Sequence, residues 1–353
     1  MYSSFEVRGF RCFEKLVLPS LARVNLIAGV NNIGKTSLLE ALFIHCGAYN
    51  PTLTLTVNGL RGISNVKLEF GSPESPWDSL FPRLDTSRVV ELVGDGRTLR
   101  LKVVREAPGL SGVSELVGRP ADPQAPVSSL DVAKVVELEY KDEQRTGRHY
   151  LIIDRTGIRA QPAPPPPPFP GFFLGARVRP TLKELGERYS KLELRGDQAL
   201  VLDTLKVIEP QLERVALLYF ADQPVLHGDA GWGLVPLPLM GGGMVCLAEI
   251  AIHVGNAKGG VLLIDEIENG LHHSVLREVW RVLGEAARRF DAQVFATTHS
   301  MECIIAAQQA FAEEGHAGDF LLHRLERATQ ETRVVTYDPE TLGAAIEMGL
   351  EVR

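Results

Sequence analysis

Apolar and polar residues alternate in short runs over the first 28 residues, which is the pattern of β-strands that bury one face. The expected strands cover residues 4–7, 10–13, 15–18 and 23–28. The spacing then changes to a helical period from Ser37 to Cys46, with Gly47 as a plausible C-cap. The pattern therefore predicts a sheet edge that leads into a helix, and it leaves residues 50–65 as a helix or a loop.

Residues from about 66 to 154 return to β-like runs, separated by glycine, proline and charged turns such as Gly94-Asp95-Gly96. The expected strands are 66–70, 87–90, 99–104, 132–140 and 150–153. Short strands joined by tight turns favour an antiparallel sheet in this part of the chain.

A proline tract follows at residues 161–170. Proline fixes the backbone and removes a hydrogen-bond donor, so the tract is neither helix nor central strand, and a stiff polyproline connector is expected. The alternative is a docking ligand for an aromatic-groove domain, although proline tracts serve as linkers far more often.

Residues 177–209 are helical in pattern and carry interspersed basic side chains, which could form a nucleic-acid face. Acidic residues alternate with them, as on an ordinary solvated helix, and this second reading is favoured. Strands at 215–220 and 224–227 come next, then Gly241-Gly242-Gly243 before an apolar helix at 245–254. A strand at 261–264, a helix at 274–290 and a strand at 292–296 complete the pattern.

Four units are expected from these changes of pattern. They are an N-terminal lobe (1–160), a proline-rich linker (161–171), a helical subdomain (172–210) and a C-terminal lobe (211–353).

Composition adds limits to this picture. The 353 residues are 45% hydrophobic, enough for one large or two ordinary cores, and the formal net charge of −7 gives no global attraction to nucleic acid. No run of eighteen apolar residues and no secretory signal occurs, so a cytoplasmic protein without a membrane partner is expected. The four cysteines lie far apart without CxxC spacing, which argues against disulfides or a zinc site.

The segment Gly29 to Thr36 reads GVNNIGKT and lies between an expected strand and an expected helix. Glycines let backbone N–H groups curl around phosphates, and the helix N-terminus adds a partial positive charge. Lys35 is expected to reach the β- and γ-phosphates, and Thr36 to bind Mg²⁺. The remaining loop residues expected at the nucleotide are Asn31, Asn32, Ile33, Gly34 and Ser37. A glycine turn with a surface lysine is the weaker reading, because both flanking elements are present.

The run Val261-Leu262-Leu263-Ile264 ends in Asp265-Glu266, which is a Walker B pattern. An acid at the end of a buried strand can hold Mg²⁺ and its water, which suits Asp265, and the next acid can accept a proton from attacking water, which suits Glu266. His299 follows the strand at 292–296, where α/β proteins bind ligands. A histidine on its own is more often structural, but the order of motifs here favours a functional one.

Taken in order, "FRCF", "NLIAGVNNIGKTSLLEALF", "LMGGGM", "LLIDEIENGLHHSVL" and "ATTHS" resemble the RecF/SMC-like branch of ABC-type ATPases. That branch includes the ATPase half of overcoming-lysogenization-defect (OLD) nucleases and ATPases of the Gabija and PARIS anti-phage systems. The resemblance covers roughly residues 1–50 and 205–353. It implies an α/β P-loop NTPase of ABC ATPase-head type, with a mixed central sheet, an antiparallel β-subdomain and a small helical subdomain.

The resemblance also implies a head-to-tail homodimer that shares two ATP sites. Arg11 would contact the nucleotide, and Gly241, Gly242 and Gly243 would touch the partner's γ-phosphate. The loop Asn269-Gly270-Leu271 would cross the dimer interface, and His299 would sense the γ-phosphate. Two departures stand out: Met240 replaces the usual signature serine, and no glutamine is assignable to the loop between the lobes.

Missing features narrow the expectation. No long heptad pattern indicates an SMC coiled coil, and the roughly fifty residues after His299 are too few for a Toprim nuclease domain. The leading hypothesis is a Mg²⁺-dependent ATPase whose dimer controls a separately encoded effector or nuclease, or acts on DNA. The alternatives are an ATP-holding scaffold with little turnover, a RecF-like DNA-repair ATPase and, as a poorer fit, a transporter ATPase.

Overall fold

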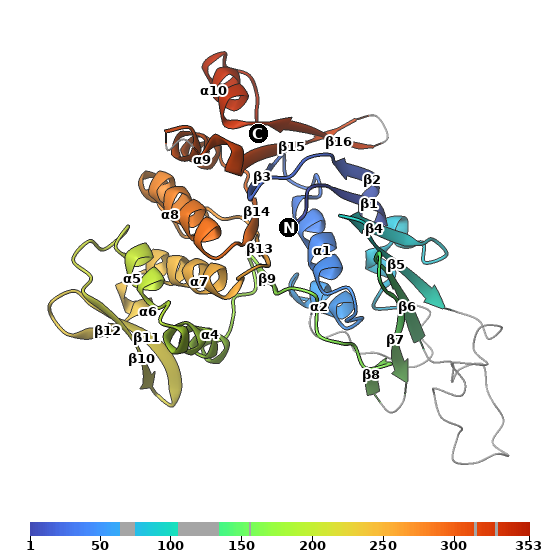
Figure 1. Cartoon of the computed structure of the whole chain (residues 1–353), viewed down its shortest axis with the longest axis horizontal. Coiled ribbons are helices and arrows are strands. Elements are labelled where there is room, and N and C mark those ends of the chain that lie inside the picture. Colours follow the sequence, from blue (N-terminus) through green and yellow to red (C-terminus); the bar gives the residue numbers. More distant parts are fainter. Residues whose placement is uncertain (64–74, 105–133, 155–156, 314–315, 329–330) are drawn as a thin grey trace.

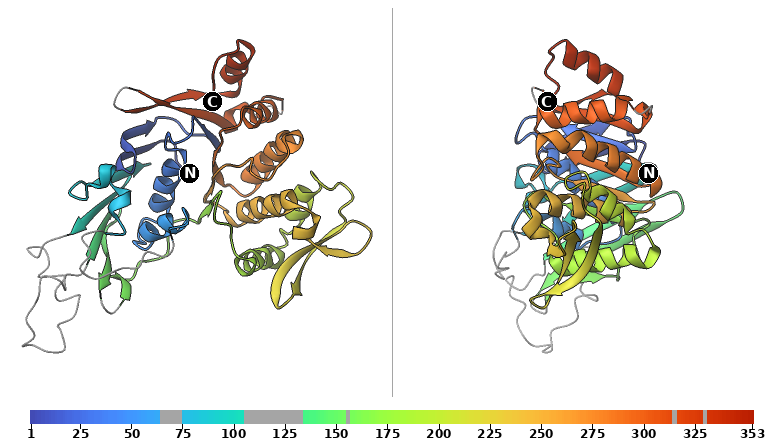
Figure 2. Two further views of the ribbon diagram at one scale, coloured as in Figure 1. Left: turned by 180° about the vertical axis from the view of Figure 1, so that it is seen from behind. Right: turned by 90° about the vertical axis from the view of Figure 1, so that its left-hand side faces the viewer.

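The computed structural model describes residues 1–63, 75–104, 134–154, 157–313, 316–328 and 331–353. An antiparallel sheet and a mainly parallel central sheet face each other across a helix, and further helices cover the outer face of the central sheet (Figure 1). A smaller helical lobe lies beside the central sheet, and the left view of Figure 2 shows it as a separate projection. The predicted α/β fold class, with its mixed central sheet, is confirmed.

The central sheet has the strand order β16-β15-β3-β14-β13-β9. Its strands are β3 (Val24–Ala28), β9 (Gly171–Leu174), β13 (Val261–Ile264), β14 (Gln293–Thr297), β15 (Phe320–Arg327) and β16 (Thr332–Tyr337). All neighbours pair in parallel except β15 and β16, which are antiparallel. Strands β3, β13 and β14 are buried on both faces, which explains their continuous apolar sequences.

The other sheet is antiparallel, in the order β2-β1-β4-β5-β6-β7-β8. Its strands are β1 (Phe5–Phe10), β2 (Phe13–Leu18), β4 (Val90–Gly94), β5 (Arg97–Val104), β6 (Lys134–Lys141), β7 (Thr146–Asp154) and β8 (Gly157–Gln161). The predicted turn at Gly94-Asp95-Gly96 joins β4 to β5, with Asp95 and Gly96 at positive φ. The strand expected at 66–70 lies outside the described residues.

Helix α1 (Lys35–Cys46) lies between the two sheets and is buried almost all round, because both sheets turn apolar side chains toward it. Leu38 and Leu42 are fully buried there, and such leucines contribute about 2–5 kcal/mol each relative to alanine. The short helix α2 (Leu53–Gly59) follows, within the segment that the pattern left open. Two 3-10 turns, Asp78–Leu80 and Pro82–Leu84, come before β4.

The helical lobe contains α4 (Leu182–Arg195), α5 (Ala199–Leu205) and α6 (Leu237–Met240). A three-stranded sheet packs on them, formed by β10 (Arg214–Phe220), β11 (Gln223–Asp229) and β12 (Leu234–Pro236). Thr181 caps α4 in a capping box with Glu184. The expected start of this subdomain at residue 172 differs from the structure, because Phe172 to Leu174 form β9 of the central sheet.

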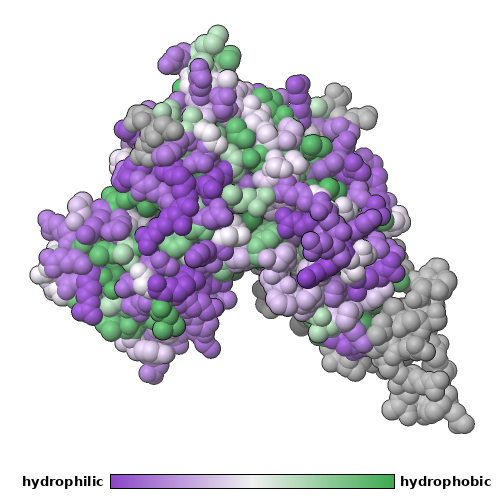
Figure 3. Space-filling view, in the orientation of Figure 1, coloured by the Kyte–Doolittle hydropathy of each residue, from purple (hydrophilic) through white to green (hydrophobic). Residues whose placement is uncertain are grey.

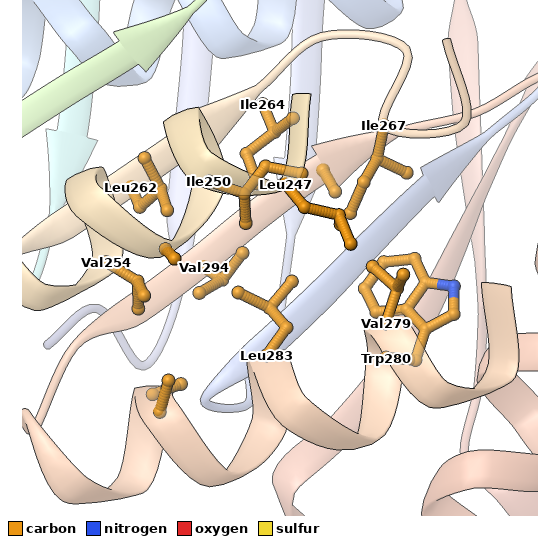
Figure 4. Close-up of a cluster of buried hydrophobic side chains, with 14 of the residues drawn as sticks. Leu247, Ile250, Val254, Leu262, Ile264, Ile267, Val279, Trp280, Leu283 and Val294 are labelled. Atoms are coloured by element: carbon orange, nitrogen blue, oxygen red, sulfur yellow. The ribbon is translucent and has the colours of Figure 1, made fainter. Parts of the chain in front are cut away.

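The outer face of the central sheet is covered by α7 (Gly242–Asn256), α8 (Leu276–Arg289), α9 (Met301–Glu313) and α10 (Pro339–Glu347). A 3-10 turn at His273–Val275 leads into α8, and another at Ala317–Asp319 leads into β15. Figure 4 shows the core at this layer, where Leu247 and Ile250 of α7 and Trp280 and Leu283 of α8 belong to one cluster with Leu262 of β13. This packing fixes the sheet that carries the site.

The face shown in Figure 3 is mainly hydrophilic, with apolar patches that include one over the helical lobe. The large apolar side chains exposed there include Leu218, Tyr219, Phe220 and Trp232. Within the ranges that the structure describes, no helix is long and apolar enough to span a membrane. Three of the cysteines are buried and Cys12 is exposed; all four are free thiols.

Candidate functional site

Four parallel strands end at one edge of the central sheet. Strand β3 leads into the glycine loop, β13 into Asp265, β14 into Thr298 and His299, and β9 into a loop that contains Arg177. A cavity of about 710 Å³ opens at this edge, where open α/β sheets bind their ligands. The loop residues Asn31, Asn32, Gly34, Lys35, Thr36 and Ser37 line it together with Asp265 and Glu266. The side chain of Ile33, another loop residue expected at the nucleotide, is buried in a hydrophobic core cluster and does not line the cavity.

The glycine loop is packed tightly against its own chain. Gly34 has φ +111°, and a Cβ there would lie 2.5 Å from the ring of Phe13 and 2.7 Å from the sulfur of Cys12. Gly34 therefore satisfies both the dihedral angle and the space at the start of α1. Its carbonyl accepts from Leu38, so the first N–H groups of α1 face the cavity, where an anion is favoured.

Lys35 is buried, and its ammonium donates to the carbonyls of Gly29 (2.6 Å) and Val30 (3.2 Å). Burial lowers the pKa of Lys35, while Glu266 and Asp265 act in the opposite direction. The ammonium thus rests on the loop that encloses the cavity, within reach of any phosphate bound there.

Asp265 meets Thr36 at the floor of the cavity. The Thr36 hydroxyl lies 3.1 Å from both carboxylate oxygens of Asp265, and Thr297 donates to the same carboxylate at 2.7 Å. Burial raises the pKa of Asp265, and the two hydroxyl donors partly oppose that effect.

A hydroxyl and a carboxylate converging in this way are the hard oxygen ligands that Mg²⁺ prefers. Among the described residues no cluster of three or more His, Cys, Asp or Glu side chains forms a metal site. Thr36 and Asp265 therefore fit an ion that takes its other ligands from phosphate and water, as Mg²⁺ commonly does.

Glu266 has φ +52°, a strained conformation for a non-glycine residue. Its backbone N–H donates to the Thr297 hydroxyl at 2.8 Å, and its carboxylate accepts from the Asn269 side chain at 2.6 Å. These contacts fix the turn after β13 and hold the carboxylate on the cavity wall.

Arg11 lines the cavity, but its guanidinium is paired with Glu40 of α1 at 2.6 Å. Glu40 is fully buried and also pairs with Arg61 at 2.6 Å, and Arg11 donates to Asn58 at 3.1 Å. Burial lowers the pKa of Arg11, and Glu40 opposes that effect. The structure thus shows Arg11 in a charged cluster behind the loop, beside the expected nucleotide position.

The other expected site residues do not line the cavity within one chain. Gly241 and Gly242 are exposed at the start of α7, on the helical lobe. His299 is half exposed, and its ring nitrogen lies 3.2 Å from Glu268, which also accepts from the Thr298 hydroxyl. One chain therefore brings the glycine loop together with Asp265 and Glu266, whereas Gly241, Gly242 and His299 do not line the cavity.

The residues at the site that the sequence expectations did not include are, among others, Glu40, Arg61, Thr297 and Arg177. Glu40 gave a usable signal, because a carboxylate inside an apolar helical run calls for a buried cationic partner. Thr297 gave a weaker one through its place at a strand end. Arg61 and Arg177 gave no signal in the sequence. Arg61 reaches the cavity through its ion pair with Glu40, and Arg177 through the pairing of β9 with β13.

The fold is similar to that of a solved SMC head bound to the C-terminal winged-helix domain of ScpA. The TM-score is 0.53 at 14% identity, over 98% of this chain and 99% of that one. The fold is therefore that of an ABC-type ATPase head of the SMC-like kind, and the site that it carries fits an ATP hydrolase.

Sequence comparisons add more particular likenesses. Residues 167–304 match a family model described as "AAA domain, putative AbiEii toxin, Type IV TA system". The chain is 26% identical to an ATP/GTP phosphatase of Helicobacter pylori over 97% of both proteins. It is 24% identical to an OLD nuclease of Thermus scotoductus over 85% of this chain, spanning 59% of that protein. Within its class the chain thus resembles OLD-family ATPases.

Proposed function

We propose that this chain binds and hydrolyses ATP with Mg²⁺ as a head-to-tail dimer, and that its nucleotide state switches a partner effector or a DNA transaction. The observation that carries the proposal is the convergence of Lys35, Thr36, Asp265 and Glu266 on one cavity. A phosphate cradle, a metal-binding pair and an acid are the parts that phosphoryl transfer to water requires.

Each side chain then has a defined task. Lys35 leaves the carbonyls of Gly29 and Val30 and donates to the β- and γ-phosphates. Thr36 and Asp265 hold Mg²⁺, which supplies charge neutralisation at the phosphates when it is bound. Glu266 accepts the proton of the attacking water, in the position where Asn269 and Thr297 fix it.

The dimer accounts for the residues that one chain leaves unused. Gly241 and Gly242 are exposed at the N-terminus of the fifteen-residue helix α7, which suits an anion held by a second copy. In a head-to-tail arrangement these glycines would close the partner's cavity over the γ-phosphate.

The partner part of the proposal rests on the sequence relatives. The OLD nuclease is longer than this chain, which spans 59% of it. We propose that a separately encoded effector, such as a nuclease in anti-phage defence, supplies the activity that the dimer controls. A RecF-like role in DNA repair is the alternative pathway.

The test is Glu266→Gln, which keeps the size of the side chain and its hydrogen bond to Asn269 but cannot accept the proton. We expect ATP binding within about threefold of wild type, turnover lowered at least about 100-fold, and a dimer trapped by ATP. Glu285→Gln, an exposed residue of α8, is the matched control. Undiminished hydrolysis by Glu266→Gln would refute the proposed mechanism.

A scaffold that holds ATP without turnover is the second candidate, and Met240 favours it. The Met240 sulfur lies 2.9 Å from the position that a Cβ on Gly228 would take, so this side chain packs against the lobe. It offers no hydroxyl group to a phosphate. Steady-state hydrolysis with and without DNA separates the two, because a scaffold shows no turnover in either condition.

A further inference from the structure

The loop that leaves β9 brings an arginine to the Walker B side of the cavity. Strand β9 runs parallel to β13 with Leu174 opposite Ile264, and the carbonyl of Leu174 accepts from the N–H of Asp265 at 2.8 Å. Arg177 follows three residues later and lines the cavity with Lys35, Asp265 and Glu266. Figure 1 shows β9 at the junction between the central sheet and the helical lobe.

The loop is held at both ends. Its start is fixed by the Leu174 contact, and Arg179 pairs with the buried Glu249 of α7 at 2.5 Å. Thr181 then caps α4 in its capping box. Arg177 therefore projects from a short segment between two fixed points, which lowers the cost of ordering its side chain around a ligand.

The charges around the cavity show why this arginine matters. Arg11 and Arg61 also line it, but both are committed to Glu40. Arg177 is exposed and, among the residues that the structure describes, has no hydrogen bond or ion pair.

Position separates Arg177 from the remaining arginine of the cavity. Arg83 follows Leu80, whose carbonyl accepts from the N–H of Arg11, whereas Arg177 follows β9, the strand that pairs with β13 directly before Asp265 and Glu266. The Walker B acids mark the end of the cavity where the terminal phosphate is attacked.

Building on the proposed function, we propose that Arg177 binds the γ-phosphate of ATP within the same chain and makes the cavity distinguish ATP from ADP. A guanidinium offers a planar fork of donors that matches two phosphate oxygens. Since ADP lacks the terminal phosphate, this contact exists only in the ATP state. Arg179 acts as a positioning residue, and its pairing with Glu249 links the same loop to the helix that carries Gly242.

The test measures the affinities of ADP and of the imido analogue of ATP, both with Mg²⁺, for wild type and Arg177→Ala. We expect the affinity for the analogue to fall about 10- to 100-fold and that for ADP to stay within about twofold. Arg177→Lys should lose less affinity for the analogue than Arg177→Ala, because lysine keeps the positive charge but not the planar pair of donors of the guanidinium. Arg333→Ala, an exposed arginine of β16 away from the cavity, should match wild type.

Equal losses for both nucleotides, or no loss for either, would overturn the inference while the proposed function stands. Failure of wild type to bind the analogue would refute both. For Arg179→Met we expect a smaller loss of the preference for the analogue at unchanged ADP affinity. An equal loss for both nucleotides in that variant would contradict its positioning role.

Discussion

Two glycine segments in this protein precede helices, and the chain treats them in opposite ways. At Gly34 the place of a side chain is filled: φ is +111°, and a Cβ would collide with Phe13 and Cys12. In the second segment Gly241 has φ +131° and a Cβ on Gly243 would lie 2.9 Å from Ile208, but a Cβ on Gly242 would meet no atom within 4 Å. The fold of the chain itself requires glycine at position 34. Nothing around Gly242 in the same chain explains why this position has no side chain.

The difference indicates where the second half of the site lies. A helix interior or start with open space tolerates larger residues, and glycine there costs up to about 1 kcal/mol relative to alanine. The proposed function explains this cost, because the close approach of a partner's γ-phosphate to the N–H groups of α7 excludes side chains. Substitutions at Gly34 and at Gly242 test whether the two segments differ in this way.

The largest effect is expected for Gly34→Val. A β-branched residue at φ +111° in contact with Phe13 should cost about 3 kcal/mol of unfolding free energy or more, and should abolish ATP binding. Urea unfolding followed by circular dichroism, together with nucleotide titration, measures both. Wild-type stability in this variant would show that the loop relaxes freely, against the packing described.

A more selective effect is expected for Gly242→Glu. The side chain has open space and an acid in the first turn favours the helix, so stability should stay within about 0.5 kcal/mol of wild type. Turnover should fall at least about tenfold, because the carboxylate repels the partner's phosphate. The comparison fails if turnover survives, or if the variant unfolds more easily than wild type.

The smallest effect is expected for Asp265→Asn in the nucleotide-free protein. Burial raises the pKa of the Asp265 carboxyl group in the folded protein above its value in the unfolded chain. At a pH above the pKa of the unfolded chain, ionisation of Asp265 therefore destabilises the folded state. The amide should therefore stabilise the protein by on the order of 1 kcal/mol at pH 7. The gain should shrink as pH falls through the raised pKa, and a gain that grows instead would contradict this assignment. The same variant should lose Mg²⁺-dependent ATP binding.

The sequence predicted strands β3 and β13, with the segment from Gly29 to Thr36 after the first and Asp265 and Glu266 after the second, because local patterns specify each. The sequence did not predict β9 (Gly171–Leu174), which directly follows the proline tract. This strand has only four residues, which is too short to show a hydrophobic periodicity. The ion pair of Arg11 also shows the limit of what local patterns predict. Its partner Glu40 is distant in sequence, and only the packing of α1 between two sheets brings the two charges together.

The central claim is that each ATP site is shared by two chains. Mixing Lys35→Ala chains with Gly242→Glu chains, under two different affinity tags and with ATP, tests it most directly. Each variant alone should be inactive, but the isolated mixed dimer has one complete site, with the loop from one chain and the glycines from the other. We predict about half of the wild-type turnover per dimer. Failure to form a mixed dimer, or a mixed dimer as inactive as its parents, would contradict the account.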